Sequence, residues 1–325
     1  MSAAGFSPWQ QRAYDQAVAA LDAGRLGHGL LICGPQGLGK RAMAQRLAQH
    51  VLEGGRPAGE GRTAQLLAAG THPDFQLVSF IPNRTGDKLR TEIVIEQVRE
   101  VSQKLALTPQ YGAAQVVVID PADAINRAAC NALLKTLEEP APGRYLWLIS
   151  AQPQRLPATI RSRCQRLEFR LPPRAEALDW LRRQGHDAAE AAEALDAARG
   201  HPGLADAWLR EDGLALRRAI ARDLARLEQG EAGVLETAQR WSDEHADARL
   251  AHAADWVLAQ AGAGLTDAAR LHKLATWFDA ANRTRDLLRT TVRADLAMVE
   301  LLRAWAGPDR QRAAHASRQS QESRE

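Results

Sequence analysis

The amino-acid sequence predicts an α/β domain built on a parallel sheet, followed by two α-helical regions. Three observations lead to this fold class. Short apolar runs alternate with helical periodicities up to about residue 170, as in strands joined by crossover helices. The first apolar run enters a glycine-rich turn and then a helical pattern. Beyond residues 171–173, which read Leu-Pro-Pro, the chain is rich in alanine, leucine and arginine at helical spacing.

The elements of the α/β domain follow from its apolar runs and turn residues. The predicted strands cover residues 30–33, 74–80, 116–119, 146–149 and 167–169. Helical periodicity predicts helices over residues 41–52, 94–105 and from about 124 to 137. The run from Val116 to Ile119 is continuous and β-branched, as expected for a strand covered on both faces. We expect Asp123 to cap the helix that follows it and Pro140 to end that helix.

The change in composition also sets the predicted domain boundaries. We predict a P-loop core domain over residues 1–170 and a small helical domain over 171–209. A larger helical domain follows over 210–306, and the polar, aperiodic segment 307–325 is expected to be disordered. The turn Arg199-Gly200-His201-Pro202-Gly203 interrupts the helical half.

Composition and the distribution of apolar residues and cysteines limit the class of protein. The 42 basic and 39 acidic residues leave a net charge of +3, which is too small to predict nucleic-acid binding from electrostatics alone. The sequence has no apolar run of 18 residues and no secretory signal pattern, so we expect a cytoplasmic protein. Cys33, Cys130 and Cys164 stand singly, which matches neither a disulfide framework nor a metal site and predicts three buried hydrophobic side chains.

The glycine-rich turn matches a phosphate-binding loop of the Walker A type. Its residues are Gly34, Pro35, Gln36, Gly37, Leu38, Gly39, Lys40 and Arg41. The glycines allow backbone N–H groups to approach phosphate oxygens, and the following helix presents its positive end. Lys40 is expected to reach the outer phosphates. The pattern therefore predicts that this loop descends from a nucleotide-binding loop.

Two departures predict that this site does not hydrolyse a nucleotide. The eighth position of the loop normally supplies a hydroxyl to Mg²⁺, and here it is Arg41. Asp120 ends an apolar strand as the second acidic element should, but Pro121 follows where a water-activating glutamate usually stands. Asp123 is either a displaced substitute for that glutamate or the helix cap. Whether ATP or ADP still binds to the loop is left open.

Several segments resemble the subunits of bacterial clamp loaders, and the delta-prime family of DNA polymerase III in particular. The most specific are residues 131–140, which contain LLKTLEEP, and 156–164, which end in Ser-Arg-Cys. Further resemblance lies in Pro8-Trp9 and in residues 25–28, 70–75, 98–101 and 295–302. The resemblance covers nearly the whole chain, although the C-terminal part matches mainly by helical character.

The resemblance implies an AAA+ core with a helical lid and a helical collar. It implies a hetero-pentamer with delta and gamma or tau subunits, which opens a ring-shaped sliding clamp and places it on primed DNA. In that family the Ser-Arg-Cys arginine, here Arg163, points in trans at the γ-phosphate of a neighbouring ATPase. The alternative is that Arg163 only stabilises the ring through an ion pair. Arg161 and Arg166 flank it but lack the motif position.

The chain departs from the family pattern at two further places. Related subunits commonly carry a four-cysteine zinc module, but residues 53–69 contain no cysteine, so we expect no zinc. The lid of an active subunit would supply a sensor arginine, and residues 200–206 place none at the matching position. This second departure again predicts a silent nucleotide site.

The sequence therefore favours a non-hydrolysing ring member that requires no cofactor and offers Arg163 to a neighbour. Polymerase activity would belong to the holoenzyme that it serves. An active gamma- or tau-type AAA+ ATPase is the alternative from the enzyme class, and it requires Arg41, Pro121 and the missing sensor arginine all to be tolerated. A degenerate P-loop scaffold unrelated to replication is a third hypothesis, which the two specific motifs disfavour.

Overall fold

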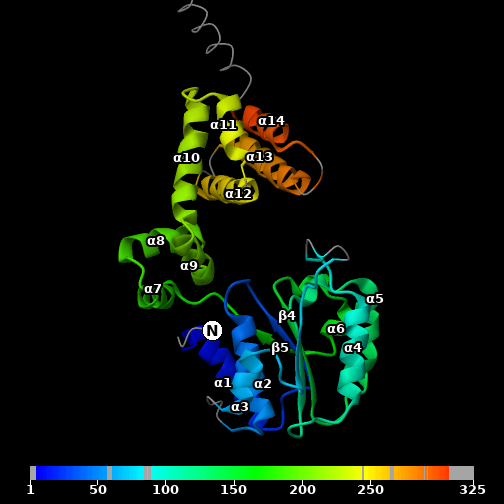
Figure 1. Ribbon diagram of the computed structural model, residues 1–325. Helices are drawn as coiled ribbons and strands as arrows, with labels where there is room; N and C mark the ends of the chain where they lie inside the picture. The colour runs from blue at the N-terminus through cyan, green and yellow to red at the C-terminus, as the bar shows by residue number, and fades with distance from the viewer. Residues whose placement is uncertain are drawn as a thin grey trace, which may run out of the picture. The chain divides into compact units, whose positions relative to one another are not determined.

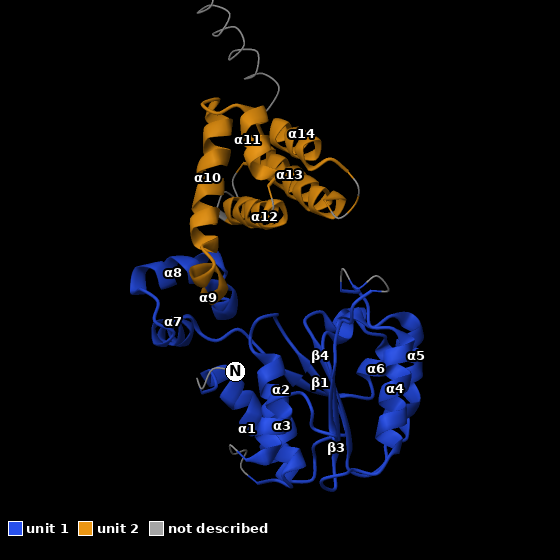
Figure 2. Cartoon of the chain, viewed as in Figure 1, with its two compact units in different colours: residues 1–205 blue, residues 206–325 orange. Residues whose placement is uncertain are grey.

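The computed structural model describes residues 5–56, 61–83, 86, 89–243, 245–263, 267–288, 290 and 292–306. The chain divides into two compact units, residues 1–205 and 206–325 (Figure 2). The division falls within helix α9 (Pro202–Arg210). The segment 307–325, which the sequence predicts to be disordered, lies outside the described residues.

A parallel five-stranded sheet forms the centre of the first unit. Its strands are β1 (Gly29–Cys33), β2 (Phe75–Val78), β3 (Gln115–Ile119), β4 (Arg144–Ser150) and β5 (Gln165–Glu168), in the spatial order β2-β3-β4-β1-β5. Every strand pair in this sheet is parallel. All residues of β1 and β3 are buried, as predicted for strands covered on both faces.

Helices cover both faces of this sheet (Figure 1). One layer contains α1 (Pro8–Asp22), α2 (Lys40–Leu52) and α3 (Arg62–Ala68); the other contains α4 (Ile95–Ala106), α5 (Arg127–Glu138) and α6 (Ala158–Arg161). Each layer has its own apolar core against the sheet. The sequence thus predicted this α/β architecture correctly.

The predicted cap of α5 was wrong. Asp123 lies in a short 3₁₀ turn, Ala122–Ala124, that precedes the helix. The N-cap is Asn126, whose side chain accepts a hydrogen bond from the backbone N–H of Ala129 at 2.9 Å. Asparagine caps a helix as well as aspartate does, so residue type alone gave no reason to prefer Asp123.

The first unit continues into the helices α7 (Arg174–Arg183), α8 (Ala188–Ala197) and the start of α9. Two contacts join α7 to α1. The guanidinium group of Arg12 forms a two-pronged ion pair with Glu176, at 2.8 and 2.9 Å. The rings of Trp9 and Trp180 meet edge-on, with their centroids 5.2 Å apart.

The second unit is a helical bundle with its own core. It contains α10 (Gly213–Gln229), α11 (Val234–Trp241), α12 (Ala246–Ala263), α13 (Ala268–Leu287) and α14 (Ala294–Ala306). Buried tryptophans hold it together through apolar contact and indole hydrogen bonds. Trp277 donates to the carbonyl of Leu301 at 3.0 Å, and Trp305 to that of Leu224 at 2.9 Å. Among the described helices, none has the length and apolar character needed to cross a membrane.

Candidate functional site

The phosphate-type loop joins the end of β1 to the start of α2, as the sequence predicts. Gly34, Gly37 and Gly39 have φ values of 139°, 83° and 78°, which side chains rarely permit. At Gly34, a Cβ atom would lie 2.2 Å from the carbonyl oxygen of Phe169, so this position also requires the small residue. The loop is therefore held close to the end of β5.

Lys40 turns back onto the loop that it follows. Its Nζ donates to the carbonyl oxygens of Gly34 at 2.7 Å and Pro35 at 2.6 Å. The residue is only 6% exposed. Burial lowers the pKa of Lys40, and the nearby carboxylates of Asp120 and Asp123 oppose that effect. The cation that would reach the outer phosphates is thus engaged by backbone oxygens of its own loop.

Arg41 forms an ion pair with the acidic residue at the end of β3. Its Nε lies 2.5 Å from Oδ2 of Asp120. In an active site of this type the corresponding carboxylate helps to hold Mg²⁺. A guanidinium group on that carboxylate places a fixed positive charge where the metal ion would bind. Mg²⁺ binding would require this pair to separate and would add charge repulsion.

Asp123 lies close enough to Lys40 to affect its pKa. Its Oδ1 atom is buried and has no hydrogen-bond partner in the described part of the chain. Since Asp123 does not cap α5, the hypothesis that it substitutes for the missing glutamate stays a prediction. Pro121 itself offers no group that could activate water.

The lid segment after α8 lies directly against the loop. A Cβ atom on Gly203 would stand 2.0 Å from the carbonyl oxygen of Gly37, so the two backbones touch. The ring of His201 lies 3.3 Å from the position that a Cβ on Gly37 would occupy. Burial lowers the pKa of His201, a hydrogen bond with the Gln36 backbone opposes this, and the charge of Lys40 adds to it.

The N-terminal helix approaches the same loop. The indole N–H of Trp9 donates to the carbonyl of Leu38 at 3.1 Å, and Nε2 of Gln10 donates to that of Gly39 at 3.0 Å. The Gln10 side chain lies so close to Gly39 that a Cβ there would meet it at 2.1 Å. The loop residues are thus contacted by α1, by the lid segment and by Asp120.

Arg163 lies just after α6 and is far from the phosphate-type loop in the sequence. Its Nη2 lies 2.6 Å from Oε1 of Glu138, the last residue of α5, and its Nη1 donates to the carbonyl of Thr159 at 3.0 Å. The arginine side chain is 37% exposed. A partly exposed guanidinium group can be reached by an anion from outside the chain.

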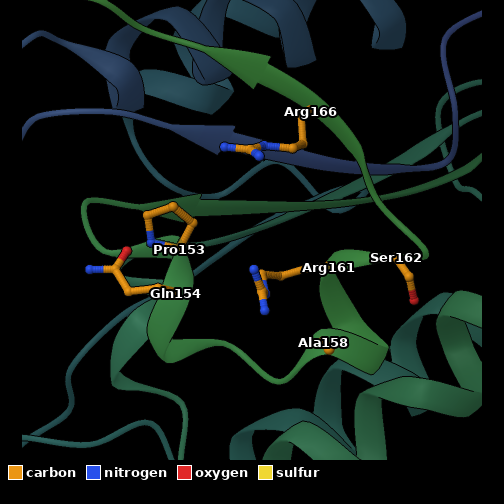
Figure 3. A pocket seen from close by; sticks show the side chains of 6 residues that line it. All are labelled: Pro153, Gln154, Ala158, Arg161, Ser162 and Arg166. Carbon is orange, nitrogen blue, oxygen red and sulfur yellow. The ribbon is translucent and has the colours of Figure 1, made fainter.

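A shallow hollow of about 530 Å³ lies beside this motif. It is lined by Pro153, Gln154, Ala158, Arg161, Ser162 and Arg166, and none of these six residues is acidic (Figure 3). The side chain of Arg161 makes no hydrogen bond or ion pair with the described residues, whereas the guanidinium group of Arg166 donates to the thiol sulfur of Cys33 at 3.7 Å. The lining of this hollow therefore carries positive charge and no negative charge.

Comparisons with known proteins show the family to which the chain belongs. A family model described as DNA polymerase III, delta subunit, matches residues 9–173. The chain is 37% identical over 260 residues to the DNA polymerase III subunit delta' of Pseudomonas aeruginosa, covering 77% of this chain and 76% of that protein. It is 36% identical to the same subunit of Escherichia coli, covering 67% of this chain and 65% of that one. The chain belongs to the delta-prime family of DNA polymerase III clamp-loader subunits.

The architecture also matches a solved structure. A DNA polymerase III gamma-subunit-related protein of Thermotoga maritima aligns with a TM-score of 0.51 and 15% identity, over 89% of this chain and 97% of that one. At this identity the likeness concerns the fold. It supports an AAA+ core followed by C-terminal helices for this member of the delta-prime family.

The three cysteines are free and buried, as the sequence predicts. Burial raises the pKa of the Cys164 thiol to about 11, so it stays protonated at neutral pH. Within the described residues no group of three potential ligands is arranged to hold a metal ion. The zinc prediction concerned residues 53–69, of which 57–60 lie outside the described part.

The sequence identified the loop and Arg163 but missed four residues around them. Gln10 and His201 contact the loop, Gly203 brings the lid backbone against it, and Glu138 holds Arg163. The turn around His201 and the LLKTLEEP segment stood out only as patterns. Their contacts depend on segments far apart in the chain, so no local pattern could assign them.

Proposed function

We propose that this chain is a non-hydrolysing member of a clamp-loader ring and supplies Arg163 in trans to the ATP site of a neighbouring subunit. It would assemble with delta and gamma or tau subunits into a hetero-pentamer that loads a sliding clamp onto primed DNA. In this role it requires no nucleotide and no zinc of its own. The polymerase reaction belongs to the holoenzyme.

The ion pair between Arg41 and Asp120 carries the non-hydrolysing part of this proposal. It occupies the carboxylate that a nucleotide-bound Mg²⁺ ion would need. Pro121 supplies no base, and Gly203 has no side chain to contact a phosphate group. Any side chain at position 203 would meet the Gly37 carbonyl, so the lid has no room there for a sensor arginine.

The position of Arg163 supports the activating part. Its guanidinium group is planar, permanently charged and partly exposed. Such a group can neutralise the charge that spreads over phosphoryl oxygens during transfer, and arginine fingers supplied in trans contribute on the order of 10³–10⁵ in rate. The neighbouring Arg161 and Arg166 would favour the approach of the negatively charged nucleotide bound to the neighbouring subunit.

The deciding experiment is ATP hydrolysis by the loader reconstituted with the Arg163→Ala variant. We expect turnover at the adjoining site to fall on the order of 10³-fold, while gel filtration shows the same fraction of assembled ring. Arg161→Ala is the matched comparison, because it removes the same charge close to Arg163; a loss on the order of 10³-fold confined to Arg163→Ala would therefore exclude a general effect of lost positive charge. Loss of assembly with unchanged turnover per intact ring would contradict the finger role and favour an interface role.

The isolated chain provides a second measurement. Its Mg²⁺-dependent ATP hydrolysis should not exceed that of the Lys40→Ala variant, because Arg41 pairs with the carboxylate that would hold Mg²⁺ and Pro121 supplies no base. Clear hydrolysis that the Lys40→Ala change abolishes would instead favour an active ATPase of the gamma or tau type.

A further inference from the structure

The two sequence segments that are most specific to the family meet at one ion pair. Glu138 belongs to the LLKTLEEP segment and is the last residue of α5. Arg163 belongs to the Ser-Arg-Cys segment, 25 positions later in the sequence. Their side chains approach to 2.6 Å, and α5 packs against α6 in the same core.

We propose that Glu138 is a positioning residue for Arg163 and orients its guanidinium group toward the nucleotide of the neighbouring subunit. The inference rests on the proposed role of Arg163 as a finger in trans. It assigns to the LLKTLEEP segment a part in the reaction in addition to its helical packing.

The geometry leaves the arginine able to bind a phosphate group while it is held. Nη2 faces Glu138 and Nη1 faces the carbonyl of Thr159, so each terminal nitrogen makes one of the two contacts. A guanidinium group has five N–H donors, and the Nε–H has no partner among the described residues. The remaining donors can form a fork toward phosphate oxygens.

The position of Glu138 is unfavourable for a carboxylate as far as its own helix is concerned. A carboxylate at the C-terminal end of a helix is disfavoured by the helix dipole, and α5 ends with Glu138 followed by Glu139. The cation of Arg163 compensates for this at Glu138. Glu139 is also exposed but forms no ion pair with the described residues.

The exposure of the pair suits a group that must respond to a ligand. The side chains of Arg163 and Glu138 are 37% and 47% exposed, and exposed ion pairs are weak. The pair therefore limits the rotamers that Arg163 explores but does not prevent a small adjustment when phosphate arrives. A free arginine would lose more side-chain entropy in reaching the same geometry.

The test compares Glu138→Gln with Glu139→Gln in the reconstituted loader. Glu138→Gln keeps the size of the side chain but removes its charge, and we expect kcat for ATP to fall about two- to five-fold, the range of an exposed ion pair. KM for ATP should stay unchanged, because the neighbouring subunit binds the nucleotide. Glu139→Gln should leave both constants unchanged.

A double-mutant cycle separates positioning from a purely structural role. If Glu138 acts through Arg163, the Arg163→Ala, Glu138→Gln double variant should turn over no more slowly than Arg163→Ala alone. An additive loss, or a loss of assembled ring with unchanged kcat, would overturn the inference. A rise in kcat for Glu138→Gln would also overturn it, since Glu138 would then compete with phosphate for Arg163.

The failures of the two proposals are distinguishable. If Arg163→Ala has no effect on turnover, the proposed function itself is wrong. If Arg163→Ala lowers turnover but Glu138→Gln behaves like Glu139→Gln, only the positioning role is wrong.

Discussion

Arg41 and Arg163 are each ion-paired to a carboxylate of their own chain, but the surroundings of the two carboxylates differ. Asp120 is 16% exposed and lies at the end of a buried strand beside the buried Lys40. Glu138 is 47% exposed at the end of a surface helix. A carboxylate that has lost most of its water depends on its partner, whereas an exposed one can exchange that partner for solvent.

The comparison indicates how one kind of interaction serves two purposes. Both arginine side chains are partly exposed, 47% for Arg41 and 37% for Arg163, so the arginines themselves are not what distinguishes the two pairs. The difference lies in the carboxylates, since Asp120 has lost much more of its exposure to water than Glu138. In the proposed roles, the more buried carboxylate belongs to the contact that blocks the metal position, and the exposed carboxylate belongs to the contact that orients Arg163.

The largest expected effect tests how rigidly the loop is packed. Gly34→Ala should lower the free energy of unfolding by roughly 2–4 kcal/mol, because the new Cβ would combine a left-handed backbone with a clash. Urea denaturation measures the change. Gly112→Ala is the control, since Gly112 is not among the glycines with a positive φ and a Cβ there would lie at an ordinary 3.5 Å from the carbonyl oxygen of Leu52. Equal stability of both variants would show that the loop can move away from Phe169.

The next effect compares the two ion pairs directly. Asp120→Asn should destabilise the chain by about 1–2 kcal/mol, because Arg41 and the buried Lys40 lose a countercharge. Glu138→Gln should cost about 0.5 kcal/mol or less, since its pair is exposed. Thermal or urea unfolding of both variants gives the difference. If Glu138→Gln were the more damaging change, the proposed contrast between the two sites would be wrong.

A third prediction concerns the metal position. Arg41→Ser removes the guanidinium group from Asp120 and restores a hydroxyl at the eighth position of the loop. Binding of a fluorescent ATP analogue should become Mg²⁺-dependent by about tenfold, while hydrolysis stays absent because Pro121 supplies no base. Binding that stays insensitive to Mg²⁺ in this variant would mean that the lid and α1 close the site without help from Arg41.

The smallest effect is a pH dependence at the lid. The pKa of His201 is lowered in the folded chain, so the unfolded state takes up its proton first as pH falls. The stabilising contribution is therefore complete above about pH 6.5 and decreases as pH falls toward the folded-state pKa. Urea midpoints at pH 7.5 and 5.5 should differ less for His201→Gln than for the unchanged chain. All other histidines are the same in both proteins, so their contributions to the pH dependence cancel.

Much of the fold was predictable because it depends on local patterns. The buried strands appear as continuous apolar runs, and the loop appears as glycines between a strand and a helix. The cap of α5 was predicted at Asp123 and lies at Asn126. Two good capping residues lie three positions apart there, and only the path of the 3₁₀ turn selects between them.

The sequence by itself determined the α/β class, the loop, the loss of its hydroxyl and base, and the position of Arg163 in a specific motif. Only the tertiary structure decided that Arg41 meets Asp120, that Gly203 touches Gly37, and that Glu138 holds Arg163. The physical reason is that these contacts join residues brought together by crossovers of the sheet and by the return of the lid. Periodicity and spacing predict structure that depends on neighbours along the chain. Contacts between segments far apart in the sequence depend on how the sheet and its helices pack.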